Sequence, residues 1–313
     1  MMDLFSIIVP VHNRAYCLER TFMSIYNQGY RPLELILVDN NSSDGSWEMC
    51  CGLQKHFSST DFPIQVLRED KQGVCAARNL GAKSAHGAYL YFFDSDDEMS
   101  VDYLQQMNDI LNKNPLCDCV AVRTVMVFEN GRCVLRKSTF TTEVSDQILT
   151  GMLSTQSMLM RKGFFFKIGM WNEDLPRWND WELGVRCLLH RPVLVWSDKC
   201  YHRIYQHVNS ITGKGFAADV ELLTLAIDHV ERLIKAPQCD NVSRQRAINA
   251  LLARRILLAA LCHREGALTD SKRLYAASLR GSNSFLFRQF LRLLYCYQCA
   301  GGIGGWKIAR LFI

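Results

Sequence analysis

The first hundred residues alternate between short apolar runs and segments with helical spacing, and this alternation strongly limits the folds open to the chain. The apolar runs are LFSIIVPV, LELILVD, PIQVLRE and AYLYFF, which begin at residues 4, 33, 63 and 88. Segments with apolar residues three or four positions apart lie between them, at 15–28, 46–57 and 73–85. This order predicts an α/β fold, with a mostly parallel sheet and helices on both faces.

The segments that follow the four predicted strands are expected to border one crevice, because ligands bind beyond the carboxyl ends of parallel strands. These segments are residues 10–14, 39–45, 69–73 and 94–97. No GxGxxG follows the first strand, and GxxxxGK[ST] does not occur in the sequence. A dinucleotide-dependent dehydrogenase and a P-loop enzyme are therefore not expected. We expect a nucleotide site of another kind.

The fourth strand ends in three carboxylates within four residues, Asp94, Asp96 and Asp97. Like charges so close together raise one another's pKa, so a cation is expected beside them. Mg²⁺ and Mn²⁺ take oxygen ligands from one or two carboxylates and from substrate phosphates. The cluster therefore predicts a metal that binds together with a diphosphate, with Asp97 as a second ligand or a helix cap. The alternative is that DSDD only caps a helix that begins near Met99.

Four segments in this order resemble the family 2 glycosyltransferases of the GT-A fold: SIIVPVHNR, ELILVDNNSSDGS, GVCAARNLGAKSAHGAYLYFFDSDD and WNDWELGVRCLLH. The resemblance covers about residues 3–215. It implies a metal-dependent, inverting transfer of a sugar from a nucleoside diphosphate to a glycan or lipid-linked acceptor, in surface polysaccharide biosynthesis. UDP is the favoured nucleotide, although guanine and thymine present a similar N–H.

The resemblance also assigns roles to residues. Asp94 and Asp96 match the DxD motif, with Asp96 the better candidate for direct contact with Mn²⁺ or Mg²⁺. Asp39 matches the carboxylate that accepts the N–H of the base. Gly73 would let the backbone approach the nucleotide, and Arg78 would meet the pyrophosphate or support the acidic cluster. The other residues expected to bind substrate come from the matching segments, Pro10, His12, Asn13, Arg14, Asp44, Ser95 and Trp178, and from the later segment that carries Arg203.

An inverting transfer needs a base that deprotonates the acceptor hydroxyl, and Asp180 matches the family's base. The residue before it is Asn179 in place of the usual Glu. Glu182 is the rival, but if Asp180 opens a helix, Glu182 points about 200° away around it. Trp178 and Trp181 flank Asp180 and suit a sugar site, although Trp181 fits a core position equally well. The alternative role of Asp180 is an N-cap.

The segment YHRIYQHVNSIT resembles the part of the family that closes over the donor diphosphate. His202 or His207 would complete the metal coordination, and Arg203 would reach phosphate. A lone His is more often structural, so neither His is favoured.

The last third of the chain is helical and basic. Residues 232–313 carry 14 Lys and Arg against 3 Asp and Glu, a net charge of +11, whereas residues 1–231 have a net charge of −6. We therefore predict a GT-A domain at 1–215 and a helical region at 216–313. The segments LLARRILLAALCHR and FLFRQFLRLLYCYQ pair apolar faces with arginines. They suit either an anionic membrane surface or a helical subdomain with solvated arginines.

The composition is that of a soluble globular protein, with 49% hydrophobic and 21% charged residues. Its thirteen cysteines are scattered, which favours a reduced, cytoplasmic protein, and the basic helices would suit the inner face of the cell membrane. The N-terminus lacks a basic signal-peptide region, and no apolar segment is long enough to span a bilayer.

Two other functions stay open. A sugar nucleotidyltransferase usually has a glycine-rich basic loop after its first strand, where this chain has PVHNRAYC. A binding protein without turnover would keep the fold, but a retained acidic cluster without a metal costs stability. Nucleic acid is not expected as a partner, since no recognisable binding motif accompanies the basic charge.

Overall fold

The structure of the chain is a computed structural model that describes residues 4–136, 139–206, 215–236 and 241–313. The chain forms two compact units. Unit 1 comprises residues 1–138, 153–176 and 192–207, and unit 2 comprises residues 139–152, 177–191 and 208–313. The division therefore differs from a single boundary at residue 215, because the segment that contains Asp180 belongs to the unit of the C-terminal helices.

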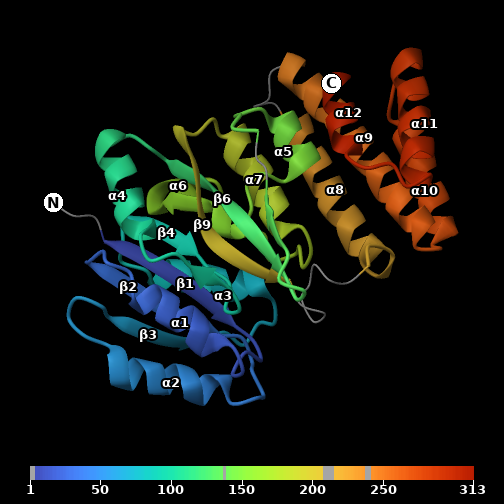
Figure 1. Cartoon of the computed structure of the whole chain (residues 1–313). Helices are drawn as coiled ribbons and strands as arrows, with labels where there is room; N and C mark the ends of the chain where they lie inside the picture. Colours follow the sequence, from blue (N-terminus) through green and yellow to red (C-terminus); the bar gives the residue numbers. More distant parts are fainter. Residues whose placement is uncertain (1–3, 137–138, 207–214, 237–240) are drawn as a thin grey trace. The chain divides into compact units, whose positions relative to one another are not determined.

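Unit 1 is built on a mixed sheet (Figure 1). Its strands are β1 (Phe5–Val11), β2 (Leu33–Asp39), β3 (Ile64–Arg68), β4 (Tyr89–Phe92), β5 (Glu98–Met99), β6 (Cys119–Phe128), β7 (Cys133–Leu135), β8 (Met158–Arg161) and β9 (Leu194–Gln206). Their order across the sheet is β3-β2-β1-β4-β8-β6-β9-β5, with β7 beside β6. The first four strands pair in parallel, as the sequence predicts, whereas β8 is antiparallel to both β4 and β6.

Helices cover both faces of this sheet. They are α1 (Leu18–Tyr26), α2 (Ser46–Phe57), α3 (Val74–Ser84), α4 (Tyr103–Lys113) and α6 (Lys162–Lys167), with the short 3₁₀ helix η1 (Thr155–Ser157) before β8. Apolar residues of α1, α2 and α4 share one core with alternate residues of the strands. Helix α3 packs on β1 and β2, where an added Cβ at Gly81 would lie 2.5 Å from Ile8. Every residue of β1 and β2 is buried, as expected for strands covered on both faces.

Unit 2 is helical. Its helices are α5 (Val144–Thr150), α7 (Asn179–Leu189), η3 (Ala217–Asp219), α8 (Val220–Lys235), α9 (Asn241–Arg264), α10 (Leu268–Arg280), α11 (Phe285–Cys299) and α12 (Gly305–Leu311). Helix α9 is central and packs against α5, α8, α10, α11 and α12. The helices expected after residue 216 are confirmed. In the part of the chain that the structure describes, none of them is both long enough and apolar enough to cross a membrane.

Candidate functional site

The loop after β1 is bonded to the loop after β2. His12 Nδ1 lies 2.7 Å from the carbonyl oxygen of Asn40, and the N–H of Asn13 donates to Ser42 Oγ over 3.0 Å. Asn13 and Asn41 have φ values of 52° and 56°, in the left-handed region that Asn tolerates better than most residues. These contacts hold the two loops side by side at the carboxyl ends of their strands.

Asn40 joins this pair of loops to the loop after β3. Its Nδ2 donates to the carbonyl oxygens of Glu69 and Lys71 over 2.9 and 2.8 Å, and its Oδ1 accepts the N–H of Gly73 over 2.8 Å. Gly73 has a φ of 131°, which residues with a side chain rarely adopt. The sequence analysis missed Asn40, whose only signal was its place beside Asp39 in the polar run NNSSDG.

Asp39 ends β2 with its side chain fully buried, at 0% exposure. Its Oδ2 accepts the N–H of Ser42 over 3.3 Å and lies 3.5 Å from Nε of Arg68. Among the residues that the structure describes, no hydrogen bond reaches Oδ1. A buried acceptor left without a partner costs about 1–3 kcal/mol. This oxygen is therefore suited to an N–H donor from a ligand.

The carboxylates that follow β4 are paired with arginines. Arg78, buried on α3, donates from Nη2 to Asp94 Oδ1 over 2.7 Å. Its guanidinium carbon lies 4.4 Å from the centre of the Trp171 ring. Arg14, in the loop after β1, donates from Nε to Asp96 Oδ2 over 3.2 Å. Arg78 thus supports the acidic cluster, which is one of the two roles predicted for it.

Asp97 is buried within the same cluster. Its Oδ1 accepts the N–H of Tyr205 over 2.8 Å, and its Oδ2 accepts from Nε2 of Gln156. Gln156 also donates to Asp94 Oδ2 over 3.0 Å. Burial, followed by the charges of Asp94 and Asp96, raises the pKa of Asp97 well above its usual value. No sequence pattern indicates Gln156, because its partners Asp94 and Asp97 are 62 and 59 residues away.

The helix-cap interpretation of DSDD is wrong. Glu98–Met99 forms β5, which pairs with β9, and helix α4 begins only at Tyr103. The N-cap of α4 is Asp102. The acidic cluster therefore lies in a turn between two strands.

The donor atoms near β4 suit a cation that arrives with a diphosphate. Among the described residues, no group of three His, Cys, Asp or Glu side chains could hold a metal ion. Asp94 and Asp96 nevertheless offer carboxylate oxygens, and Mg²⁺ needs only one or two carboxylates when phosphates supply further ligands. The crowded charge that raises the pKa of Asp97 is also what a divalent cation would relieve. The residues fit a metal site that is completed by substrate phosphates, and not a site formed by protein ligands alone.

His202 has a structural role and not the predicted role of metal ligand. Its ring is 1% exposed and packs against Tyr91, Phe93 and Tyr103. The Tyr91 hydroxyl donates to the carbonyl oxygen of Gln156 over 2.7 Å, so it accepts the Nε2–H of His202 over 2.6 Å. Nε2 is therefore engaged, and Nδ1, which carries no proton in this tautomer, is buried within the same aromatic packing and closed to solvent. Burial lowers the pKa of His202 to about 3.

We expect His202 to reduce stability in acid. Because its folded pKa of about 3 lies below the unfolded value, the unfolded state takes up the proton first. The free energy of unfolding should fall by about 1.4 kcal/mol per pH unit from about pH 6.5 down to pH 3. His202→Phe keeps an aromatic ring and should flatten this slope, which urea titrations at about pH 7, 6 and 5 measure. If the free energy of unfolding falls equally with pH in both proteins, His202 is not the cause of the acid sensitivity.

Three further predicted residues, Pro10, Ser95 and Arg203, lie at different depths. Pro10 is buried inside β1 and not in the loop after it. Ser95 is buried between the DxD carboxylates. Arg203 lies exposed on β9, opposite Glu98 in the pairing with β5. His207 lies outside the described residues.

Asp44 has a positioning role. Its Oδ2 accepts the N–H of Ala15 over 3.1 Å, and its Oδ1 accepts the hydroxyl of Ser46 over 2.5 Å. Burial alone would raise the pKa of Asp44, but these hydrogen bonds outweigh it and lower the pKa. Asp44 therefore fastens the loop after β1 to the start of α2, and its predicted contact with substrate stays a prediction.

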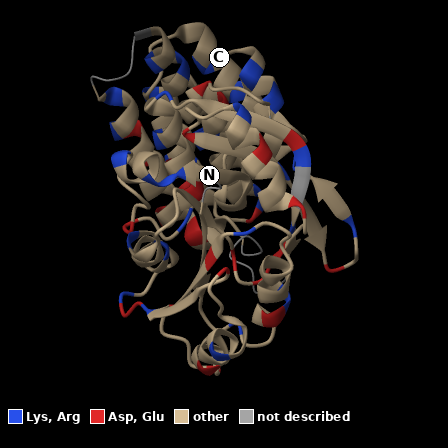
Figure 2. Ribbon diagram, turned by 90° about the vertical axis from the view of Figure 1, so that its left-hand side faces the viewer, with Lys and Arg blue, Asp and Glu red and all other residues tan. Residues whose placement is uncertain are grey.

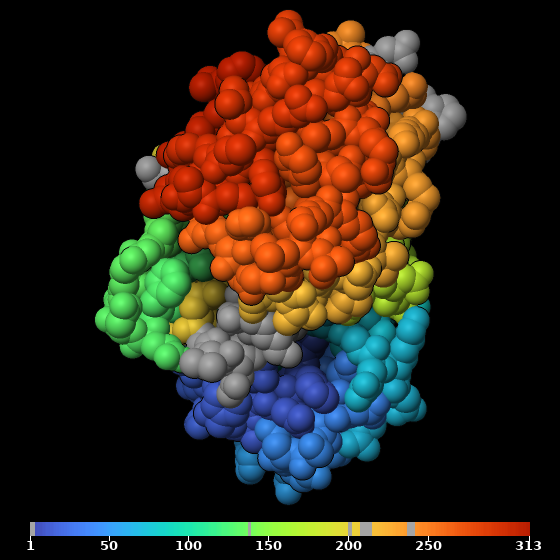
Figure 3. Space-filling model, turned by 90° about the vertical axis from the view of Figure 1, so that its right-hand side faces the viewer, coloured from blue at the N-terminus to red at the C-terminus, as the bar shows by residue number. Residues whose placement is uncertain are grey.

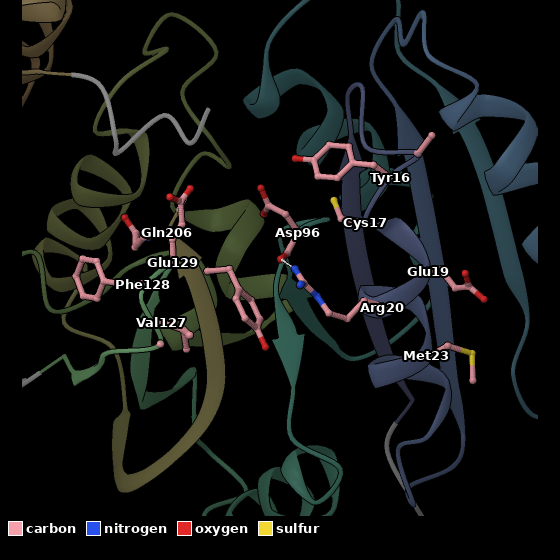
Figure 4. Close-up of a pocket in the computed structure, with 13 residues that line it drawn as sticks. Tyr16, Cys17, Glu19, Arg20, Met23, Asp96, Val127, Phe128, Glu129 and Gln206 are labelled. Atoms are coloured by element: carbon pink, nitrogen blue, oxygen red, sulfur yellow. Dashed lines mark hydrogen bonds between the residues drawn. The ribbon is translucent and has the colours of Figure 1, made fainter. Parts of the chain in front are cut away.

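A pocket of about 850 Å³ opens beside Asp96 (Figure 4). Arg20 donates to the carbonyl oxygen of Asp96, and its guanidinium carbon lies 4.0 Å from the centre of the Tyr205 ring. The other walls come from the start of α1 and the ends of β6 and β9: Ala15, Tyr16, Cys17, Glu19, Met23, Val127, Phe128, Glu129, Gly131 and Gln206. This volume is that of a typical ligand pocket, so a ligand held at Asp96 has room to extend into it.

Unit 2 carries the second acidic motif. Helix α7 begins at Asn179, and partly exposed Asp180 lies in its first turn, where its Oδ1 accepts the N–H of Trp181 over 2.8 Å. Trp178 has a φ of 54°, and the guanidinium carbon of Arg254 lies 4.3 Å from the centre of its ring. Trp181 is buried, in agreement with its alternative reading as a core residue.

Glu182 cannot serve as the base. Its side chain is fully buried, and Arg186 donates to its two oxygens over 2.6 and 2.8 Å. Nε2 of His229 lies 3.4 Å from Oε1. Burial acts to raise the pKa of Glu182, but the hydrogen bonds and charges of Arg186 and His229 outweigh it and lower the pKa. Glu182 is thus held as a buried ion pair.

The fold is similar to that of a protein of known structure. The crystal structure of S. aureus TarS 1–349 in complex with UDP-GlcNAc matches with a TM-score of 0.72 and 18% sequence identity, over 97% of this chain and 90% of that chain. The likeness identifies a GT-A fold followed by a C-terminal helical region.

Curated relatives match shorter segments. Glycosyltransferase GlyA of Streptococcus pneumoniae is 36% identical over 105 residues, which are 34% of this chain and 14% of that protein. The GalNAc(5)-diNAcBac-PP-undecaprenol beta-1,3-glucosyltransferase of Campylobacter jejuni is 37% identical over 98 residues, which are 31% of each chain. The matched part thus spans less than a third of either relative.

The family match is longer. Residues 6–169 match the sequence profile of glycosyl transferase family 2, which is more than half of the chain. The match includes most of β1, the loops that carry Asp39 and Gly73, and the DxD carboxylates, and it ends before Asp180. The chain therefore belongs to glycosyl transferase family 2.

Proposed function

We propose that the protein is a glycosyltransferase that moves a sugar, with inversion, from a nucleoside-diphosphate donor to a glycan or lipid-linked acceptor. The observation that carries the proposal is the crevice of unit 1. There, Asp39 Oδ1 has no hydrogen bond within the described residues. Asn40 joins the loop that follows Asp39 to the loop after β3, and Arg14 joins the loop after β1 to Asp96, beside Asp94. Membership of family 2 supports the same activity.

Asp39 is the proposed contact for the nucleotide base. An imide N–H of uracil would supply the hydrogen bond that Oδ1 lacks among the described residues. The TarS structure of similar fold contains UDP-GlcNAc, which supports UDP as the nucleotide. Gly73, with its φ of 131°, leaves the backbone beside Asn40 bare of a side chain, and no atom lies within 4 Å of where a Cβ would be.

Asp94 and Asp96 are the proposed holders of Mg²⁺ or Mn²⁺ together with the donor diphosphate. When bound, such a cation neutralises charge on the leaving diphosphate. Arg14 and Arg78 already contact these carboxylates and provide further positive charge beside the leaving group. Water would be displaced from this crevice as the diphosphate enters, which strengthens these charge interactions.

Asp180 is the proposed general base. It would accept the proton of the acceptor hydroxyl on a carboxylate oxygen while that hydroxyl attacks the anomeric carbon. Its partial exposure supports this role, because an acceptor must reach the carboxylate from solvent. Trp178, held by Arg254, is an aromatic surface on which a sugar ring would stack.

The acceptor and location are part of the proposal. The Campylobacter relative is named for an acceptor linked to undecaprenol through a diphosphate, which supports a lipid-linked acceptor and surface polysaccharide biosynthesis. A reduced protein at the cytoplasmic side of an anionic membrane would meet such an acceptor. The free cysteines of the described ranges agree with a reduced compartment.

Calorimetric titration tests the donor site. UDP, GDP and dTDP are titrated with and without Mn²⁺ into the wild type, Asp39→Asn and the surface control Asp109→Asn. We expect UDP to bind only with Mn²⁺, and Asp39→Asn to weaken it about 10–100-fold, because a hydrogen bond to a charged acceptor is lost. The control should bind like the wild type.

The same titrations distinguish the alternatives. If none of the three nucleotides binds, the proposal is wrong. Binding without transfer to any acceptor would favour a sugar-nucleotide-binding protein. Release of pyrophosphate from a nucleoside triphosphate and a sugar phosphate would favour a nucleotidyltransferase.

A further inference from the structure

Helix α11 exposes apolar side chains on its outer side. Leu286 is 78% and Leu293 71% exposed, and Tyr297 follows four residues after Leu293, on the same side of the helix. Phe285, at the start of the helix, is also exposed. Ile303 is 91% exposed and is held near by its carbonyl oxygen, which accepts the hydroxyl of Tyr297 over 2.9 Å. These five residues are called the α11 patch below.

The patch is not needed for packing within unit 2. A neighbouring side of α11 already buries Phe287, Phe290, Leu291 and Leu294, and the helix contacts α9, α10 and α12. A helix on the surface of a globular unit normally turns polar residues to the solvent. A gathering of large exposed apolar side chains usually marks an interaction surface. Figure 3 shows the α9–α12 region, in orange to red, as one continuous surface.

The charges around the patch have one sign. Asp270 is the last acidic residue of the sequence, and residues 271–313 carry seven Lys and Arg. Figure 2 shows more blue than red on the helices around the C-terminus. Four of these cations lie on or beside α11 and α12: Arg280, Arg288, Arg292 and Lys307. Within the described residues, none of these four forms an ion pair with a carboxylate.

This combination favours a lipid surface over other partners. Apolar side chains enter the boundary of the acyl region, while arginines bind the phosphates of anionic headgroups. A second copy of the chain would bring two sets of unpaired arginines together in a symmetric contact, and like charges repel. Nucleic acid would match the arginines but not exposed leucine and isoleucine.

We infer that the α11 patch docks unit 2 on an anionic membrane surface without crossing it. The inference deepens the proposed location at an anionic membrane, because it names the surface that meets the membrane. It concerns unit 2 alone and does not require the donor site. It also gives the chain direct access to an acceptor with a lipid anchor.

Vesicle co-sedimentation of the full chain tests the inference. The vesicles are phosphatidylcholine alone or with about one third phosphatidylglycerol. The wild type is expected to bind the anionic vesicles at least about tenfold better, and to lose this binding as NaCl rises from about 0.1 to about 0.5 M. Equal binding to both vesicles, or no binding at low salt, would overturn the inference.

Matched variants locate the surface. Leu286→Gln with Leu293→Gln should lower the bound fraction at least about tenfold, since two inserting side chains are lost. Leu225→Gln with Leu268→Gln removes two exposed leucines of unit 2 outside the patch and should leave binding unchanged. If both pairs bind equally, the patch is not the docking surface.

Two further measurements keep the result separate from folding and from donor binding. UDP calorimetry on the patch variant should match the wild type, so a failure of the donor site would not affect the membrane test. Sedimentation velocity detects self-association. A dimer that the patch variant abolishes would assign the patch to a second copy of the chain and overturn the inference.

Discussion

Asp180→Asn is expected to lower kcat by about 10²–10⁴-fold, because the acceptor hydroxyl then has no group to take its proton. The Asn oxygen can still accept the N–H of Trp181, so α7 should keep its first turn. UDP affinity should stay within about twofold of the wild type, since no binding group of unit 1 is changed. Initial rates of sugar transfer and calorimetry on the same preparations measure both quantities.

The control for this prediction is Asp109→Asn, which removes an exposed carboxylate of α4. It should keep the wild-type kcat. If Asp180→Asn also turns over at the wild-type rate, Asp180 is an N-terminal helix residue and the base lies elsewhere. A loss of UDP affinity in Asp180→Asn would instead indicate a change in structure.

Asp96→Asn is expected to abolish Mn²⁺-dependent binding of UDP and to lower kcat/KM by about 10²–10³-fold, because the cation loses a charged ligand. The Asn oxygen can keep the hydrogen bond from Arg14, so the loop after β1 should stay in place. Calorimetry with and without Mn²⁺ separates the loss of metal from a loss of fold, and Asp109→Asn is again the control.

A different outcome would mean that arginines, and not a metal ion, neutralise the charge of the diphosphate. If the wild type binds UDP equally well without Mn²⁺ and Asp96→Asn does the same, Arg14 and Arg78 neutralise the diphosphate. This result would contradict metal dependence while leaving the nucleotide site in place.

The first half of the sheet was predictable because its signals are local. Every residue of β1 and β2 is buried, and most are apolar. Helix α2 runs over Ser46–Phe57, as the apolar spacing predicts. Loops that follow parallel strands meet at one edge, so their grouping followed from strand order alone. Arg14 and Asp96 are 82 residues apart and still form the contact that this grouping allows.

The errors all come from partners far away in the sequence. A helix at Met99 was a reasonable local interpretation, but Glu98–Met99 instead pairs with Arg203 and His202 on β9. The same pairing buries His202 among aromatic rings, which a sequence that shows only YHRIYQH cannot reveal. Gln156 and Asn40 gain their importance from the hydrogen bonds they make in three dimensions, and amide side chains carry no distinctive pattern.

The way the chain alternates between its two units decides how parts of it can be exchanged with a relative. Unit 2 is assembled from three pieces of chain, 139–152, 177–191 and 208–313. Helix α9 packs on α5, and α8 packs on α7, so the early pieces supply neighbours that the late helices need. A chimera that takes only the residues after 215 from a relative would keep this chain's α5 and pack it against the relative's α9. A functional graft of the helical unit must therefore transplant all three pieces together.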